Sequence, residues 1–411
     1  MKTLKLKTVL VCLLFITILF FSNNFGLLDI EKTAIITAIG IDIKDNKYEI
    51  TAQIAVPEAT DTNAENKKTQ LSGVGNTVGE ALKEIGDTSG WYPQLYFCNL
   101  LVLGRETTNQ NCIKMLDYFA KTLRLQDSAV VVLAEGSAKE ILESTSPLDN
   151  ISSFALQKIL LKAQGFNDDV ATVDIKSFCA GYYSDIGASF MPIVKIKKVE
   201  EGDNSSGGQN SGDSSSSSSG QEQASASEGG TKTGGSCVFI ASNTALYKDG
   251  LLVGNLNGEQ TIMLNAFRGK SLRHTTLAVN NVSPSLVESQ HNYLFTILRC
   301  NPKMKLKATK NFLKLDIDVS IYGKISDLNA EYSDSTYSKN LPISNAVKEA
   351  FTQKVTDIIN SLIDTTKQTG CDFLGIGEKL YRYNYKHYAR YKDNYINKMQ
   401  TEVKVNLTGQ K

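Results

Sequence analysis

The chain begins with a lysine-rich segment that is followed by an apolar stretch. Three lysines within the first seven residues precede an uncharged run from Val9 to Phe21, and apolar residues resume from Phe25 to Leu28. About twenty residues at 1.5 Å per residue span the hydrocarbon core of a bilayer. Lysines at the start favour the cytoplasmic side, so the remainder of the chain is expected outside the membrane. The pattern predicts that residues 1–28 are a signal anchor or a signal peptide.

Three fates of this segment remain open: retention as an anchor, cleavage as a signal peptide, and lipidation. Signal peptidase needs small residues just before the cut, and the stretch offers only Ser22 and Gly26 at a poor spacing. A lipidated cysteine follows the apolar run, whereas Cys12 lies inside the run behind Val11. The residues therefore favour a retained N-terminal membrane helix, and no lipidation is expected.

A segment rich in serine and glycine, residues 200–236, divides the rest of the chain. It has almost no apolar side chains, so it cannot bury enough surface to offset its ordering entropy and is predicted to be disordered. Two interpretations remain open. The segment is either a linker between two folded bodies or a long loop with its ends on adjacent strands, because Pro192–Ile196 and Cys237–Ile240 both have strand patterns that could pair.

Residues 29–199 mix the periods of strands and helices. Two β-rich runs, 34–43 and 48–56, flank a turn signal at 44–47 and predict a hairpin. The later predicted elements are a helix at 76–85, a strand at 96–103, a helix at 109–123, a strand at 129–134 and a helix capped by Ser137. This order indicates an N-terminal α+β domain with room for two subdomains.

Residues 237–408 are predicted to form a C-terminal α+β domain. A second hairpin is expected around Lys248–Gly250, and strict alternation from Phe312 to Tyr322 indicates a sheet with one solvated face. A long helix from Ser344 to about Lys367 follows. The chain then offers helices at 372–381 and 388–399 and a closing strand at 402–407. The predicted fold class is thus α+β and multi-domain, with mixed or antiparallel sheets flanked by helices.

Composition excludes some functions. The 44 basic and 43 acidic residues give a net charge of +1, so nothing supports nucleic-acid binding. Beyond Cys12, six cysteines are scattered without a C-x-x-C pair, which argues against a zinc ribbon and a thioredoxin-like motif. Most of them are expected to be buried thiols.

Motifs that would carry catalysis are missing from the sequence. The three histidines form no H-E-x-x-H, and there is neither a G-x-S-x-G elbow nor a phosphate-binding loop of the G-x-x-x-x-G-K-[ST] type. The glycines at 73, 75 and 79 do not match a dinucleotide loop. Asp316 and Asp318 alternate along a strand and are interpreted as part of its solvated face. We therefore expect that the protein is not an enzyme and that it has no catalytic, cofactor-binding or metal-binding residues.

Tyrosines and cations cluster near the C-terminus. Six tyrosines between Tyr381 and Tyr395 are interleaved with five lysines and arginines between Lys379 and Lys392. Amphipathic rings beside cations suit an interface with a protein or with lipid headgroups. The simpler interpretation, favoured here, is that Tyr388 and Tyr395 anchor the core and the others lie at the surface.

Short motifs follow one another in a characteristic order: Leu28–Glu31, Ala34–Asp42, Ala52–Pro57, Leu101–Gly104, Val130–Gly136, Cys371–Gly377 and Val403–Leu407. This order resembles the Ger(x)C family, the C subunits of spore germinant receptors. The chain looks like a divergent member, because Leu27–Leu28 stands where the family carries its lipobox cysteine, and Tyr388 and Tyr395 occupy the places of two tryptophans. The family motifs are structural, and their positions are Asp29, Glu31, Gly40, Asp42, Pro57, Gly104, Gly136, Asp372, Gly375, Gly377, Tyr388 and Tyr395.

The resemblance implies a non-enzymatic subunit without a cofactor, held by its N-terminal helix at the outer face of the spore inner membrane. Its partners would be a large membrane A subunit and a transporter-like B subunit, in a complex that responds to small germinants. The alternative is a cell-envelope protein that binds a ligand or serves as a scaffold for a transporter.

Overall fold

The computed structural model describes residues 33–55, 70–90, 92–121, 125–146, 149, 151–162, 168–198, 237–272, 274–282, 291–329 and 343–409, together with Val11, Leu13, Leu14 and Thr17. The predicted anchor at 1–28 lies outside the described residues except for those four positions, and so does the serine-rich segment. Among the described residues, no helix is both long enough and apolar enough to cross a bilayer.

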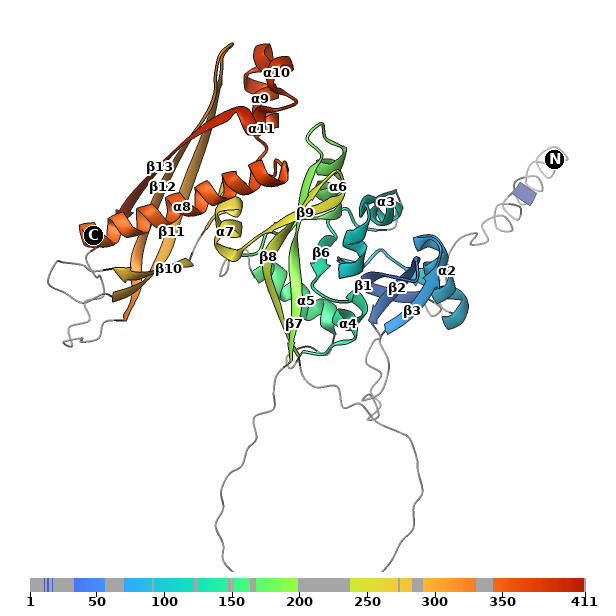
Figure 1. Cartoon of the computed structure of the whole chain (residues 1–411). Coiled ribbons are helices and arrows are strands. Elements are labelled where there is room, and N and C mark those ends of the chain that lie inside the picture. The colour runs from blue at the N-terminus through green and yellow to red at the C-terminus, as the bar shows by residue number, and fades with distance from the viewer. Residues whose placement is uncertain are drawn as a thin grey trace, which may run out of the picture.

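A mixed nine-stranded sheet organises the first body of the molecule (Figure 1). Its strand order is β3-β2-β1-β5-β6-β7-β8-β9, and β4 pairs with β1 off this path. The strands are β1 (Thr33–Lys44), β2 (Lys47–Ala55), β3 (Gln70–Gly75), β4 (Tyr92–Gln94), β5 (Leu100–Leu103), β6 (Val130–Ala134), β7 (Ala188–Lys198), β8 (Cys237–Lys248) and β9 (Leu251–Leu256). The four central strands β1, β5, β6 and β7 are parallel, while the pairs at either side are antiparallel.

Both predicted hairpins are present, with the tight turns that their sequences require. The β1–β2 turn holds Asp45 and Asn46 at φ of 50° and 59°, and the β8–β9 turn holds Asp249 and Gly250 at 50° and 78°. Positive φ at both central residues matches the right-handed twist of the flanking strands. Asn, Asp and Gly tolerate this conformation best, which explains why these local signals fixed the hairpins.

Helices cover both faces of the first sheet. Along β5, Leu101 and Leu103 pack with α2 (Val78–Ser89), α3 (Ile113–Lys121) and α6 (Ile175–Tyr183). Leu100 and Val102 point the other way, toward α4 (Ala138–Glu143) and α5 (Ser152–Lys162). A short 3-10 helix, η3 (Arg105–Asn109), follows β5. Because the central strands are buried on both faces, they are apolar throughout rather than alternating.

The second body is a four-stranded sheet covered by one long helix. Its order is β10-β11-β12-β13, formed by Thr275–Val282, His291–Ala308, Leu313–Asn329 and Met399–Gly409. Helix α8 (Asn345–Thr369) begins at the predicted cap Ser344, whose Oγ accepts the Val347 N–H at 3.3 Å, and it lies along one face of the sheet (Figure 1). Helix α7 (Gly258–Phe267) lies between the two sheets.

The C-terminal helices differ from the prediction in number and in their boundaries. In place of helices at 372–381 and 388–399, the chain forms α9 (Ile376–Tyr383), α10 (Tyr385–Tyr391) and α11 (Tyr395–Lys398). Gly375 precedes α9 at a φ of 68°, so the helix begins only after it. The predicted strand at 96–103 is also shorter, because Tyr96 and Phe97 are exposed in a turn before β5.

The strands on either side of the serine-rich segment are neighbours in the first sheet. Strands β7 and β8 pair antiparallel from Ala188 opposite Lys248 to Lys198 opposite Cys237. The first sheet thus continues beyond this segment through β8 and β9. The division of the chain into units at 29–199 and 237–408 stays a prediction.

Replacing residues 200–236 by a short Asn-Gly turn is expected to preserve the fold, because Lys198 and Cys237 are already paired. Each halving of a loop's length removes about 0.6 kcal/mol of closure cost, so the free energy of unfolding should rise by roughly 2 kcal/mol. Urea unfolding followed by circular dichroism measures the change. A scrambled segment of equal length should leave stability unchanged, and loss of the near-ultraviolet signal in the short-turn variant would contradict the pairing.

Candidate functional site

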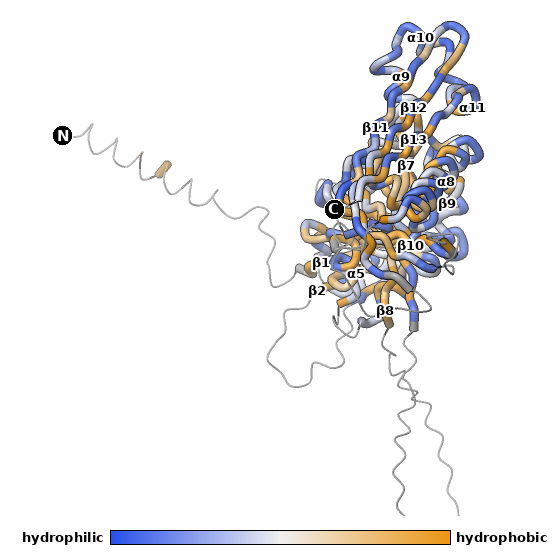
Figure 2. Tube along the Cα trace, turned by 90° about the vertical axis from the view of Figure 1, so that its left-hand side faces the viewer, coloured by the Kyte–Doolittle hydropathy of each residue, from blue (hydrophilic) through white to orange (hydrophobic). Residues whose placement is uncertain are grey.

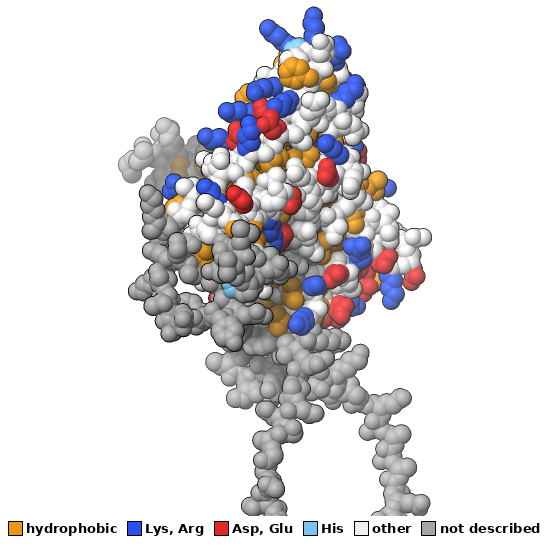
Figure 3. Space-filling model, turned by 60° about the vertical axis from the view of Figure 1, so that its left-hand side comes forward, with side chains coloured by type: hydrophobic (Ala, Val, Ile, Leu, Met, Phe, Trp, Pro, Cys, Tyr) orange, Lys and Arg blue, Asp and Glu red, His pale blue; other side chains and the backbone are white. Residues whose placement is uncertain are grey.

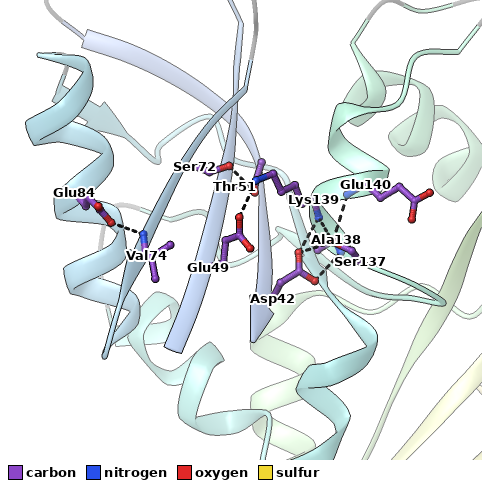
Figure 4. A network of polar contacts seen from close by, with 10 residues as sticks. All are labelled: Asp42, Glu49, Thr51, Ser72, Val74, Glu84, Ser137, Ala138, Lys139 and Glu140. Atoms are coloured by element: carbon purple, nitrogen blue, oxygen red, sulfur yellow. Dashed lines mark hydrogen bonds and ion pairs between the residues drawn. The ribbon is translucent and has the colours of Figure 1, made fainter. Parts of the chain in front are cut away.

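The first group of motif residues surrounds the carboxylate of Asp42, at the end of β1 (Figure 4). Its Oδ1 accepts the Ala138 N–H at 2.9 Å, and its Oδ2 accepts the Lys139 N–H at 2.8 Å and the Ser137 hydroxyl at 2.9 Å. The first N–H groups of a helix have no partner within the helix. Asp42, only 8% exposed, therefore caps α4 together with the predicted cap Ser137. We call this cluster the Asp42 hub.

Three motif glycines lie against the Asp42 hub. A Cβ on Gly40 would come within 3.1 Å of Ala138 Cβ, so glycine lets α4 approach the sheet closely. The Gly104 N–H donates to the Ile41 carbonyl at 2.8 Å, and the Gly136 carbonyl accepts the Arg105 N–H at 2.8 Å. The structure thus brings together Gly40, Asp42, Gly104 and Gly136, which the sequence had only placed in order.

Gly104→Ala is expected to disrupt the Asp42 hub. A Cβ at position 104 would lie 1.8 Å from Asp42 Oδ1, so the carboxylate or the strand must move. Overpacking of this kind costs about 1–3 kcal/mol, and loss of the helix cap adds to it. Chemical denaturation measures the change. Gly136→Ala is the matched control, because its Cβ would meet nothing nearer than Glu140 Oε2 at 3.5 Å; equal effects of the two substitutions would contradict the assignment.

The second group of motif residues surrounds the carboxylate of Asp372, which is 3% exposed. Its Oδ1 accepts the Ile376 N–H at 2.9 Å, and its Oδ2 accepts the Gly377 N–H at 2.6 Å and the Tyr395 hydroxyl at 2.7 Å. A Cβ on Gly377 would lie 2.7 Å from the Tyr395 hydroxyl. This Asp372 hub caps α9 and ties it to α11.

The other motif residues fall in different places. Tyr388 is half-buried and packs edge-on against Tyr381, with ring centroids 5.1 Å apart. Asp29, Glu31 and Pro57 lie outside the described residues.

The chemistry of the two hubs is structural. Each carboxylate accepts three hydrogen bonds, two from backbone N–H groups and one from a hydroxyl, so both carboxylates are engaged in holding the fold. In the described part of the chain, no three His, Cys, Asp or Glu side chains are grouped to hold a metal ion. The six described cysteines are free thiols, and five of them are buried. Burial raises the pKa of the Cys98 thiol to about 12, so that thiol is a poor nucleophile.

Sequence reasoning missed a buried polar cluster between the two bodies. Asn265 of α7 donates to the carbonyls of Asp168 and Val170 at 2.8 and 3.0 Å, and the Thr275 hydroxyl of β10 bonds the Asp168 carboxylate. Lys270 bonds Thr172 Oγ1 at 3.0 Å, and burial lowers the pKa of Lys270 to about 8. These contacts join the segment after α5 to the start of the second body. No local sequence motif predicts them.

The C-terminal sheet leaves one face open. Its polar side chains form a lattice of charges in which Lys307 and Lys314 contact Asp316 at 2.7 and 3.1 Å, and Glu402 contacts Lys314 and Lys404 at 2.5 and 2.7 Å. The two lysines hold the pKa of Asp316 below its usual range. This is the solvated face that the alternation had predicted, and exposed pairs of this kind contribute little stability.

A polar cleft of about 760 Å³ lies between α7, β10 and α8. Its lining includes Glu259, Asp357 and Lys354 as well as the amides of Asn257, Asn280 and Gln353. Lys354 contacts Glu259 at 2.7 Å and donates to the Ala278 carbonyl at 2.6 Å. Charges of both signs line this cleft, so its chemistry suits a small polar molecule rather than an apolar one.

Comparison with known proteins gives the class. Residues 28–196 match the model of the spore germination protein N-terminal domain, and residues 242–409 match that of the spore germination B3/GerAC-like C-terminal domain. The chain therefore belongs to the Ger(x)C family of germinant-receptor C subunits. Family membership supports a role in spore germination.

Two particular proteins are similar. Spore germination protein B3 of Bacillus subtilis (strain 168) is 26% identical over 182 residues, which cover 42% of this chain and 47% of that protein. The match thus spans about half the length of this curated relative. The crystal structure of the GerBC protein aligns over 93% of this chain and 100% of its own, at 14% identity and a TM-score of 0.48.

Proposed function

We propose that this chain is a non-enzymatic C subunit of a spore germinant receptor, anchored by its first 28 residues at the outer face of the spore inner membrane. There it would act in germination by binding the A-type and B-type membrane subunits. The single observation that carries the proposal is the pair of family matches, which follow one another in order over residues 28–196 and 242–409.

The chemistry of the motif residues supports a role without catalysis. Asp42 and Asp372, the carboxylates at the centre of the two motif groups, cap helices and are buried. Motif residues used in this way preserve a shape, which is what a subunit that contributes interaction surface requires.

Co-purification from dormant-spore membranes tests the proposal. A tagged full chain should bring down chains of the A and B types after mild detergent extraction, and it should stay with the membrane fraction before extraction. Recovery in the cytosolic fraction, or purification without either partner, would overturn the proposal. The mass of the native N-terminus distinguishes an intact anchor from a trimmed signal or an acylated cysteine.

The cleft between α7, β10 and α8 favours one alternative, a cell-envelope protein that binds a ligand or serves as a scaffold for a transporter. Calorimetric titration of the full chain with small amino acids addresses it. Binding that Lys354→Gln abolishes, combined with purification beside a transporter and without an A-type chain, would favour this alternative.

A further inference from the structure

Aromatic rings are exposed at the far end of the second body. Tyr381, Tyr383 and Tyr385 are 50%, 77% and 68% exposed, and Phe312 in the neighbouring β11–β12 turn is 45% exposed. Figures 1 and 2 place α9 and α10 at this projecting end, beyond the body of the sheet. We call the turn 309–312 together with residues 376–392, which include α9 and α10, the tip.

The tip is held in a defined shape. Asn384, between α9 and α10, donates to the Leu306 carbonyl at 3.0 Å and accepts the Ala308 N–H at 3.3 Å. The buried Tyr391 donates its hydroxyl to the Thr309 carbonyl at 2.9 Å. The exposed rings are thus presented on a fixed support, since both helices are fastened to the strand ends beneath them.

Positive charge gathers on the same surface. Residues 376–398 contain six lysines and arginines against two acidic residues, in a chain whose overall net charge is +1. Glu378 is paired with Arg382 at 2.5 Å, whereas within the described residues no ion pair neutralises Lys386, Arg390 or Lys392. Figure 3 shows the basic side chains around apolar ones at this end of the molecule.

We propose that the tip docks on a bilayer surface rich in anionic phosphate headgroups. Lysine and arginine bind phosphate oxygens, and tyrosine rings sit at the level of the headgroups with their hydroxyls in water. Each Lys or Arg close to such a surface contributes favourably, and the attraction is screened by salt. The tip projects outward and exposes tyrosines rather than long aliphatic side chains, which suits a broad polar surface better than a pocket on an acidic protein.

This inference goes beyond the proposed function, because it needs neither the partner subunits nor the first 28 residues. It describes a contact with a membrane that is made by the C-terminal body of the protein. Docking there would fix the orientation of the C-terminal body relative to the bilayer.

Tryptophan fluorescence in the full chain tests the docking. Trp91 is the single tryptophan of the chain, so Tyr383→Trp in a Trp91→Phe background reports on the tip alone. The protein is mixed with vesicles of phosphatidylcholine alone, or of equal parts phosphatidylcholine and phosphatidylglycerol, containing a brominated lipid. We expect a blue shift and quenching only on the anionic vesicles, with both lost in high salt.

Charge reversal separates docking by the tip from attraction of the whole chain. Lys386→Glu, Arg390→Glu and Lys392→Glu together should weaken docking by at least about a hundredfold, since each cation contributes about fivefold near such a surface. The matched control reverses three exposed cations on the strands of the same body: Arg299→Glu, Lys303→Glu and Lys324→Glu. It changes net charge equally and should leave quenching at the tip intact.

The second control moves the probe instead of the charge. Tyr322→Trp places the reporter at an exposed tyrosine of β12 away from the tip and should stay unquenched. A Trp at position 383 that remains as accessible to water as one at 322 on anionic vesicles would overturn the proposal. So would equal quenching on neutral vesicles, or shielding that requires an acidic protein.

Discussion

Asp42→Ala is expected to lower the free energy of unfolding by about 3–5 kcal/mol, one of the largest effects of any single substitution in the described part of the chain. The substitution removes three accepted hydrogen bonds at once and leaves the buried Ala138 N–H without an acceptor, while the Lys139 N–H keeps only the Ser137 Oγ at 3.1 Å. The cost of leaving a buried donor unpaired is about 1–3 kcal/mol for each group. Urea unfolding of the full chain in mild detergent measures it.

Two variants separate the Asp42 hub from general effects of removing a carboxylate. Asp318→Ala, on the open face of β12, removes the same group from a solvated position and should change stability by no more than about 0.5 kcal/mol. Ser137→Ala removes the hydroxyl that donates to Asp42 and that also caps the N-terminus of α4. This substitution should cost about 1 kcal/mol. A loss below 1 kcal/mol for Asp42→Ala would mean that water replaces the carboxylate and that the hub is not a main support.

Local signals explain which parts of the fold the sequence predicted. The hairpin turns at Asp45–Asn46 and Asp249–Gly250 and the cap at Ser344 are set by residues within a few positions of one another. The alternation of apolar and polar residues along β12 also predicted the strand correctly, because the pleat places every second side chain on the solvated face. The mixed sheets flanked by helices followed from these elements.

The parallel centre of the first sheet was not predicted from the sequence. Strands β5 and β6 are short apolar runs buried on both faces, so their pattern does not distinguish one neighbour or direction from another. Their partners are chosen by the crossovers through α3 and through α4 to α6, which bring together strands far apart in sequence. Pairing of this kind depends on the packing of whole helices and not on a motif.

The motif residues show the same limit at the level of the site. Asp42 and Ser137 are separated by 95 positions, and only the fold shows that the motif aspartate caps the helix that Ser137 begins. Near the C-terminus, the sequence predicted that Tyr388 and Tyr395 anchor the core and that the other tyrosines lie at the surface. Tyr395 is buried and Tyr388 is half-buried. Tyr391 is nevertheless buried, because its hydroxyl reaches the Thr309 carbonyl in a turn that is 82 residues away along the chain.

Asp372→Ala is expected to destabilise the C-terminal body by about 2–4 kcal/mol. It leaves the N–H groups of Ile376 and Gly377 without an acceptor at the start of α9 and frees the Tyr395 hydroxyl in the core. Relief of a buried charge offsets part of this cost, so the estimate is lower than for Asp42. Tyr395→Phe removes one of the three hydrogen bonds and should cost about 1.5 kcal/mol, whereas Tyr388→Phe, outside the hub, should be nearly neutral.

The pH dependence of stability provides a second measurement on the same residue. Burial raises the pKa of Asp372, and the N–H groups of Gly377 and Ile376 only partly counter it. The pKa in the unfolded chain is about 3.9, so between that value and the folded pKa the folded state binds more protons than the unfolded state. The contribution of Asp372 is therefore fully present below about pH 4 and is lost as the pH rises through the folded pKa. As the pH rises through this range, the urea midpoint of the parent chain should fall, and the midpoint of Asp372→Ala should not show this fall. If the midpoints of both proteins depend on pH in the same way, the carboxylate keeps its ordinary pKa.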